Sequence, residues 1–245
     1  MKNLRFLFLL TVFFSAIFFT GCNKDGDNSP EPQPEQNTTE YKAKTVKIPD
    51  AMAQSDDYGA QMTTAYLDMM NGMADYGEML TPPGKSTKIH FKDGGTDTYT
   101  WDVNEDQDHY TITLKVREEN DKTYWEMYIN GTFDGLQLNN FLFIQAEEEN
   151  DGSASTFVVY DPETGNKYMS IDWSTGNDGS VDMTFEVFEE MMLNAHVNAD
   201  GSGSVEMKQW YMNVYITAFK AQWDATGHGQ WWQYSNGAEI DSGSW

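Results

Sequence analysis

From Thr87 to the C-terminus, apolar and polar side chains alternate with a period of two residues. The alternation is clearest over 110–116, 125–129, 169–173 and 181–187, where every second residue is aliphatic or aromatic. Successive side chains of a β-strand point to opposite faces, so this pattern predicts strands with one buried face and one face toward solvent. The β-branched and aromatic residues in these segments favour the same conformation.

Short turn sequences separate these segments at regular intervals. Connections this short join antiparallel neighbours, so consecutive strands are expected to pair in chain order. We count about eleven to thirteen strands, and an antiparallel sheet of that size tends to curl or close. The sequence therefore predicts a mainly β fold, an antiparallel meander curled into a barrel or half-barrel. The predicted turns are Gly94-Gly95, Asn150-Asp151-Gly152, Pro162-Glu163-Thr164-Gly165, Asn177-Asp178-Gly179, Asp200-Gly201 and Asn236-Gly237.

The segment between Asp50 and the Pro82-Pro83 pair has a helical period instead. Its apolar side chains recur at spacings of three and four residues, which places them on one face of a helix. Asp50 or Ser55 can cap the N-terminus, the two prolines end the helix, and Gly59 or Gly72 can interrupt it. We expect this Met-rich helix to pack on the concave face or mouth of the sheet. The predicted contact stripe is Met62, Tyr66, Met69, Met73, Tyr76 and Leu80.

The N-terminus has the three parts of a secretory signal peptide, which we assign to residues 1–21. Lys2 and Arg5 are followed by an apolar run from Phe6 to Thr20, which is shorter than a membrane-spanning helix requires. Residues 19–22, Phe-Thr-Gly-Cys, resemble the bacterial lipobox, with Phe where that motif usually has Leu. The resemblance implies that Cys22, the only cysteine of the chain, becomes the lipidated N-terminus. No transmembrane helix is predicted.

Residues 22–48 are polar and rich in proline, a composition typical of an extended, disordered tether. The acidic cluster Lys24-Asp25-Gly26-Asp27 resembles the export signal of surface lipoproteins in the Bacteroidota. That resemblance implies a surface-exposed lipoprotein of the outer membrane, anchored in the cell envelope through Cys22. The rest of the chain, residues 49–245, is expected to form a single β-rich domain with the N-terminal helix.

The acidic composition excludes nucleic-acid binding. The chain has 39 acidic and 15 basic residues, and loss of Lys2 and Arg5 with the signal peptide takes its formal charge from −24 to −26. Such a surface repels phosphate backbones and anionic lipid headgroups. Since no disulfide is available, the fold must depend on its apolar core.

No familiar catalytic constellation is present, and we predict that the chain is not an enzyme and needs no cofactor. The sequence lacks a Gly-x-Ser-x-Gly elbow and a His-Glu-x-x-His pair. The four histidines, at positions 90, 109, 196 and 228, are isolated and are interpreted as surface or rim residues. Segments 102–108 and 198–203 offer oxygen ligands at alternate positions, but neither fits a complete calcium loop. We therefore predict no metal site.

Eight Trp and thirteen Tyr exceed what a core of this size requires. One hypothesis is a non-enzymatic carrier whose curled sheet holds an apolar or amphipathic ligand, in an architecture that resembles lipocalin-like half-barrels. The alternative is a surface accessory module that binds a glycan or a partner lipoprotein through exposed aromatic residues. Tryptophans inside a cavity would favour the carrier, and tryptophans on an outer face the module. The candidate ligand-lining residues are Tyr66, Met69, Met73, Trp125, Met127 and Trp231.

The C-terminal segment contains a short internal echo. Gly229-Gln230-Trp231 is followed by Gly243-Ser244-Trp245, with Asn236-Gly237 between them. This spacing is similar to the hairpin repeats of MORN-type and related lipoprotein tails. We interpret the glycines and tryptophans as hairpin packing rather than as a binding motif.

Overall fold

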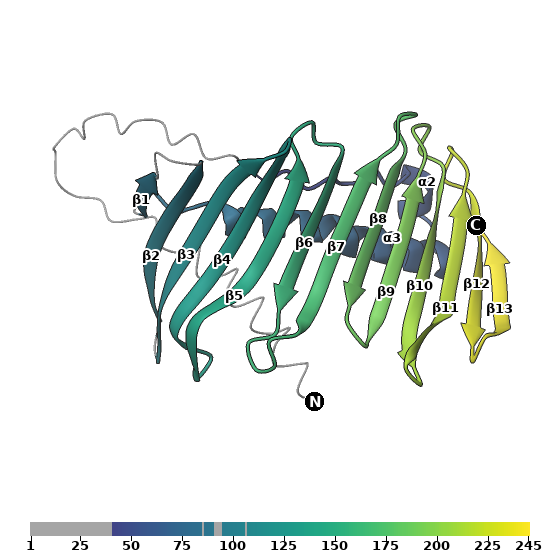
Figure 1. Ribbon diagram of the computed structural model, residues 1–245. Helices are drawn as coiled ribbons and strands as arrows, with labels where there is room; N and C mark the ends of the chain where they lie inside the picture. The colour runs from purple at the N-terminus through teal and green to yellow at the C-terminus, as the bar shows by residue number, and fades with distance from the viewer. Residues whose placement is uncertain (1–40, 85, 91–94, 106) are drawn as a thin grey trace, which may run out of the picture. The chain divides into compact units, whose positions relative to one another are not determined.

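The alternating segments form one open antiparallel sheet in the computed structural model, which describes residues 41–245 except 85, 91–94 and 106. Its 13 strands are hydrogen-bonded in chain order, from β1 at one edge to β13 at the other (Figure 1). The prediction of a meandering β fold is confirmed, and the sheet is a half-barrel rather than a closed barrel. The strands are β1 (Thr87–His90), β2 (Thr96–Glu105), β3 (Asp108–Glu119), β4 (Lys122–Phe133), β5 (Leu136–Glu149), β6 (Ala154–Tyr160), β7 (Lys167–Thr175), β8 (Val181–Val187), β9 (Met191–Val197), β10 (Gly203–Tyr211), β11 (Val214–Trp223), β12 (Gly229–Ser235) and β13 (Ala238–Ser244).

The strands reverse direction at residues that adopt left-handed backbone conformations. Five of the six predicted turns lie between neighbouring strands, and Gly94 of the sixth lies outside the described residues. The prediction missed the connections Asn120-Asp121, Asp134-Gly135 and Met212-Asn213, where non-glycine residues have positive φ. Asn and Asp tolerate this conformation because their short side chains hydrogen-bond locally, whereas Met does not have that advantage.

The helical segment has three parts, α2 (Asp50–Ala53), α3 (Tyr58–Gly72) and the 3-10 helix η1 (Met73–Leu80). Asp57 caps α3, because its carboxylate accepts hydrogen bonds from the backbone N–H groups of Gly59 and Ala60 at 2.8 and 3.4 Å. The prediction of Asp50 or Ser55 as the cap was therefore wrong for the main helix. The expected interruptions near Gly59 and Gly72 correspond to the α2–α3 break and to the change from α-helix to 3-10 helix.

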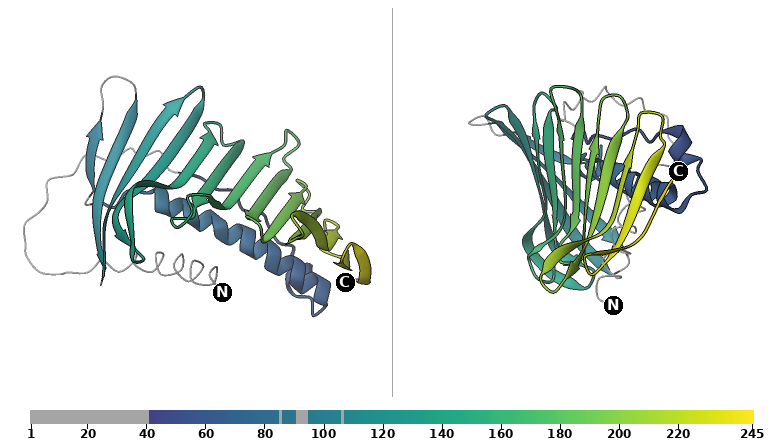
Figure 2. Two further views of the ribbon diagram at one scale, coloured as in Figure 1. Left: turned by 60° about the horizontal axis from the view of Figure 1, so that its bottom comes forward. Right: turned by 90° about the vertical axis from the view of Figure 1, so that its right-hand side faces the viewer.

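Helix α3 and η1 lie along one face of the sheet and cross its strands (Figures 1 and 2). Tyr58 at the start of α3 contacts Trp231 of β12, and Tyr76 in η1 contacts Phe157 of β6. A Cβ atom at Gly59 would lie only 1.8 Å from Cδ1 of Trp231. The small residue at this position lets the helix backbone approach the indole ring directly.

The buried face of α3 lies beside the predicted stripe. Met62, Tyr66, Met69 and Met73 are half-buried, whereas the fully buried residues are Gly59, Ala60, Thr63, Leu67 and Met70. Thr63, Leu67 and Met70 each follow a residue of the predicted stripe by one position, so the periodicity predicted the helical repeat but placed the contact face one residue away from the observed one. Thr63 was missed because it is polar, yet its hydroxyl donates to the carbonyl oxygen of Gly59 at 2.7 Å and can be buried at low cost.

An extended segment, residues 41–49, packs on the folded body ahead of the helix. Tyr41 and Val46 are buried, and the Tyr41 ring contacts Trp125 and Phe157. Asn71 holds the segment to α3 through two hydrogen bonds with the backbone of Val46. The predicted tether boundary at residue 48 is therefore too late, because composition does not reveal that two isolated apolar residues reach the core.

The echo at the C-terminus has a packing explanation. A Cβ atom at Gly229 would lie 2.3 Å from the Trp245 ring, and one at Gly243 would lie 2.8 Å from Nε1 of Trp231. Each glycine thus accommodates the tryptophan of the other Gly-x-Trp unit across β12 and β13.

The signal peptide, Cys22, the acidic cluster and the tether as far as residue 40 lie outside the described residues. Within the described part of the chain, none of the helices combines the length and apolar character needed to cross a bilayer.

Candidate binding face

The sheet has two chemically distinct faces, which we call inner and outer. On the inner face, toward the helix, cross-strand neighbours form an apolar row in which each residue is 3% exposed or less. This inner row consists of Trp125, Ala146, Phe157, Ile171, Phe185 and Leu193. On the outer face, the neighbouring positions form a polar row with one residue from each strand from β5 to β12. The polar row is Glu147, Thr156, Asp172, Thr184, Asn194, Glu206, Lys220 and Trp232.

The polar row is a continuous series of cross-strand neighbours from β5 to β12. Neighbouring strands lie about 4.8 Å apart, so a row over these eight strands extends for roughly 34 Å. All of its side chains are half-buried except Lys220, which is exposed. Such a row presents hydrogen-bonding groups at regular intervals of one inter-strand distance.

Aromatic side chains stand at both ends of the polar row. Tyr124 is the cross-strand neighbour of Glu147, and the Arg117 guanidinium carbon lies 4.2 Å from the centre of its ring. At the other end, Trp232 is half-buried beside Lys220. The Trp232 ring is an apolar platform next to polar groups, whereas the Arg117 guanidinium covers one face of the Tyr124 ring.

Two hollows lie along the outer face. The first has a volume of about 220 Å³ and is lined by Lys122, Glu147, Thr156 and Asp172 among others. The second has a volume of about 400 Å³ and extends over Asn194, Glu206, Lys220 and Trp232. Asp182 and Thr184 line both hollows, so the two lie next to each other at β8, and we call them together the outer groove.

Hydrogen bonds between strands hold the side chains of the row in place. The Thr156 hydroxyl donates to Oδ1 of Asp172 at 2.7 Å, and the Thr184 hydroxyl donates to Oδ1 of Asn194 at 3.1 Å. Each such pair links neighbouring strands on the outer face. A carboxylate has two oxygens and an amide group two N–H donors, so Asp172 and Asn194, which line the hollows, can form further hydrogen bonds.

Glu206 is the most strongly paired acid of the row. Lys208 and Lys220 lie 3.3 Å from its carboxylate oxygens, and the Thr217 hydroxyl donates to Oε1 at 2.7 Å. Burial alone would raise the pKa of Glu206, but these hydrogen bonds and positive charges lower it below the usual value. Glu206 is therefore a fixed anion.

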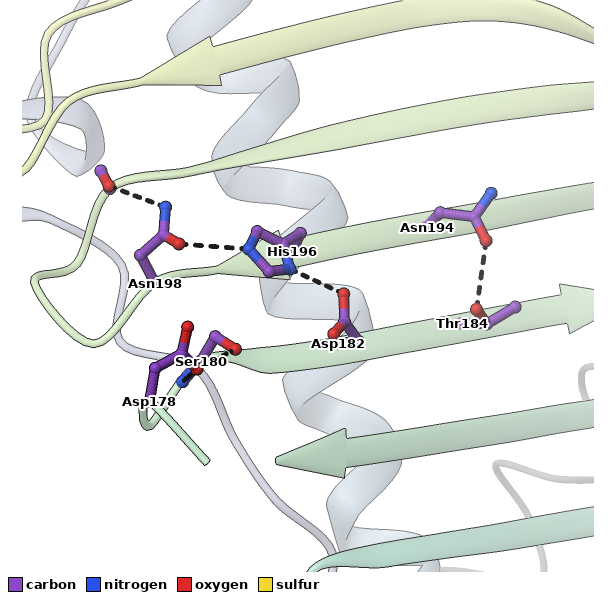
Figure 3. A network of polar contacts seen from close by, with 8 residues as sticks. Asp178, Ser180, Asp182, Thr184, Asn194, His196 and Asn198 are labelled. Atoms are coloured by element: carbon purple, nitrogen blue, oxygen red, sulfur yellow. Dashed lines mark hydrogen bonds and ion pairs between the residues drawn. The ribbon is translucent and has the colours of Figure 1, made fainter. Parts of the chain in front are cut away.

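His196 links the β8 and β9 strands at the edge of the groove. Its Nδ1 lies 2.7 Å from Oδ1 of Asp182, and its Nε2 lies 3.2 Å from Oδ1 of Asn198 (Figure 3). The hydrogen bond to Asp182 is the main cause that raises the pKa of His196 above 6.5. Sequence reasoning interpreted His196 as an isolated rim residue. Its partner could have been suggested only by the pairing of β8 with β9.

The predicted ligand-lining residues lie on the inner face and on the helix. Trp125, Met127 and Trp231 are 6% exposed or less. Tyr66 contacts Phe219 of β11, with ring centres 5.6 Å apart, while Met69 of α3 and Met73 of η1 are half-buried. Three of the six therefore contact aromatic side chains of this chain: Tyr66 contacts Phe219, Trp125 contacts Tyr41, and Trp231 contacts Tyr58.

The two segments considered for calcium instead contain turn and strand hydrogen bonds. Asp200 accepts bonds from the backbone and hydroxyl of Ser202, and Asp102 accepts one from Thr111. Among the described residues, no three His, Cys, Asp or Glu side chains are arranged to hold a metal ion.

Sequence reasoning did not identify the polar row as a site. Each polar member is one of the outward-facing residues in the alternating pattern of its strand, and any strand with one exposed face would have such residues. No protein-family profile matches this chain, and no curated protein sequence matches it.

Proposed function

We propose that this chain is a non-catalytic lipoprotein of the cell envelope that binds an extended glycan along the polar row of its outer face. The single observation that supports the proposal is the row itself, polar over the seven strands β5 to β11 and bounded by Tyr124 on β4 and Trp232 on β12. Carboxylate, amide and hydroxyl groups pair with sugar hydroxyls, and aromatic rings stack on the C–H faces of pyranose rings.

A glycan fits this face better than a partner protein does. The centres of protein interfaces are depleted in charged residues and enriched in apolar ones. The centre of the polar row has the opposite composition, with Asp172, Thr184 and Asn194 between its aromatic ends. A linear polymer of hydroxyl-bearing units can use every position of such a row.

The proposed anchor is the lipid on Cys22, which would hold the binding face near the outer membrane. The sequence resemblance to surface lipoproteins favours exposure on the outside of the cell. A glycan of the cell surface or of the surroundings is then within reach of the outer face.

The experiment is a glycan-array screen with linear oligosaccharides, followed by calorimetry on the strongest binder. Trp232→Ala and Asp172→Asn should each weaken binding by about tenfold, which corresponds to about 1.4 kcal/mol. Trp210→Ala is the matched control, because Trp210 lies outside the row and contacts Tyr215. A bound oligosaccharide whose affinity is unchanged by both row variants would contradict the proposal, as would an array without any binder.

The carrier hypothesis places the ligand on the inner face instead. The observation in its favour is the buried indole N–H of Trp231, which has no hydrogen-bond partner among the described residues. A ligand there would have to displace α3, because the helix contacts Trp231 directly. Native mass spectrometry of the purified protein tests this alternative, since a carrier should retain an apolar molecule that the glycan binder lacks.

A further inference from the structure

The hairpin between β10 and β11 ends in an exposed apolar tip. Tyr211 is 46% exposed, Met212 78% and Val214 53%. Only Asn213 separates Val214 from the other two residues. The hairpin lies at the same end of the sheet as the β8–β9 and β12–β13 hairpins (Figure 1). We call Tyr211, Met212 and Val214 the apolar tip.

The apolar tip differs from the other hairpin turns that the structure describes. Turns such as Asn120-Asp121, Asp134-Gly135 and Asn236-Gly237 consist of residues that favour left-handed conformations. Met212 has φ of +48° and Asn213 has φ of +65° in the corresponding positions. A methionine in the left-handed region is strained, and one exposed at the apex contributes no burial to the fold. The residue choice therefore points to a contact outside the chain.

The surroundings of the tip indicate the chemistry of that contact. Directly behind it, Trp210 and Tyr215 form an edge-to-face pair with ring centres 4.8 Å apart. The adjacent β8–β9 turn contributes two acidic residues, and the backbone N–H of Glu189 lies 3.2 Å from the Tyr215 hydroxyl. The backbone N–H of Trp210 donates to the carbonyl oxygen of Glu190 at 2.8 Å. The order from apex to base is apolar, aromatic and then acidic.

We infer that the apolar tip inserts into the interfacial region of a zwitterionic phospholipid bilayer. Trp and Tyr favour the zone between headgroups and hydrocarbon, because one end of each side chain is apolar and the other polar. The carboxylates of Glu189 and Glu190 would face headgroup ammonium groups, and they would repel anionic lipids.

The size of the tip favours lipid over a protein partner. A stable protein interface buries about 1,200–2,000 Å² in total, far more than three side chains at a convex apex provide. Insertion into a bilayer requires no complementary pocket, because each apolar side chain gains separately from transfer into hydrocarbon. This inference does not depend on the glycan proposal, which concerns the polar row.

The test uses the full chain reconstituted in phosphatidylcholine–phosphatidylethanolamine vesicles. Met212→Cys and, as matched control on the neighbouring hairpin, Asn236→Cys are labelled with an environment-sensitive fluorophore. The parent chain, whose only cysteine is Cys22, sets the background. We expect blue-shifted emission and several-fold stronger quenching by nitroxide-bearing lipids at position 212 than at position 236. Indistinguishable signals at the two positions would overturn the inference.

Lipid charge provides the second readout. Replacing part of the phosphatidylcholine by phosphatidylglycerol should reduce the signal at position 212, and the double substitution Glu189→Lys with Glu190→Lys should restore it. The inference would also be overturned if the emission at position 212 shifted to the blue with rising protein concentration while nitroxide-bearing lipids did not quench it. That result would assign the tip to a protein contact.

Discussion

The inner and outer faces of the sheet are made by alternate residues of the same strands, yet they are held in different ways. On β7, Ile171 is buried on the inner face, whereas the next residue, Asp172, lines the outer groove. The inner face is packed by apolar contact with α3, η1 and the segment that contains Tyr41. The outer face is held by hydrogen bonds and ion pairs between neighbouring strands.

This difference separates stability from recognition. Burial of a large apolar side chain contributes about 1.5–3 kcal/mol, whereas a cross-strand polar pair contributes roughly 0.2–1 kcal/mol. Changes on the inner face should therefore lower the free energy of unfolding strongly. Changes on the outer face should leave the free energy of unfolding almost unaltered. Residues of the polar row can therefore be selected for ligand binding without loss of stability.

The largest effect is expected at the centre of the helix–sheet contact. Leu67 is fully buried on α3, so Leu67→Ala should lower the free energy of unfolding by about 2–5 kcal/mol. The exposed neighbour Asp68 provides the control, and Asp68→Ala should change stability by less than about 0.5 kcal/mol. Urea denaturation of both variants measures the difference. Equal midpoints would mean that the helix is not needed for the stability of the sheet.

A medium effect is expected where the helix backbone touches Trp231. The Cβ atom of Gly59→Ala would lie 1.8 Å from Cδ1 of that indole, so the helix must shift, at a cost of about 1–3 kcal/mol. Gly72→Ala is the matched control on the same helix, because no atom lies within 4 Å of its Cβ position. That variant should gain up to about 1 kcal/mol from the lower flexibility of the unfolded chain. Thermal melts should show opposite shifts, and shifts of the same sign would contradict the close contact at Gly59.

The smallest effect is expected at His196 on the outer face. Its pKa is raised in the folded state, mainly by the hydrogen bond with Asp182, so protonation stabilises the fold. This contribution is fully present below the unfolded pKa of about 6.5 and is lost as the pH rises through the folded pKa. Because the pair is largely exposed, we expect less than about 1 kcal/mol.

The measurement compares the parent chain with His196→Gln by denaturation at about pH 5.5 and about pH 8.5. The difference between the two proteins should be larger at the lower pH. A difference that grows toward the higher pH would show that the pair is not held by charge. Comparison at each pH cancels the effects of the many other acidic groups.

Much of the fold could be predicted from local sequence signals. The period of two over 110–116 and 181–187 predicted strands that the structure contains, and turns such as Asn177-Asp178-Gly179 separated them. Met212-Asn213 escaped prediction because Met is not a turn former. The candidate site could not be predicted in the same way. Asp172, Thr184 and Asn194 appear in the sequence only as the polar members of three separate strands.

The sequence by itself determined the elements, because strand alternation, turn chemistry and helix capping depend on residues close together in the chain. Only the tertiary structure decided which residues became neighbours, because the pairing of strands and the position of bulges set the register over long separations. Glu147 and Trp232 belong to one row only because seven consecutive pairings between β5 and β12 align their members. In the same way, Gly59 belongs to the buried face of α3, with Ala60, Thr63, Leu67 and Met70, because its lack of a side chain permits direct contact with Trp231, which helical periodicity alone does not reveal.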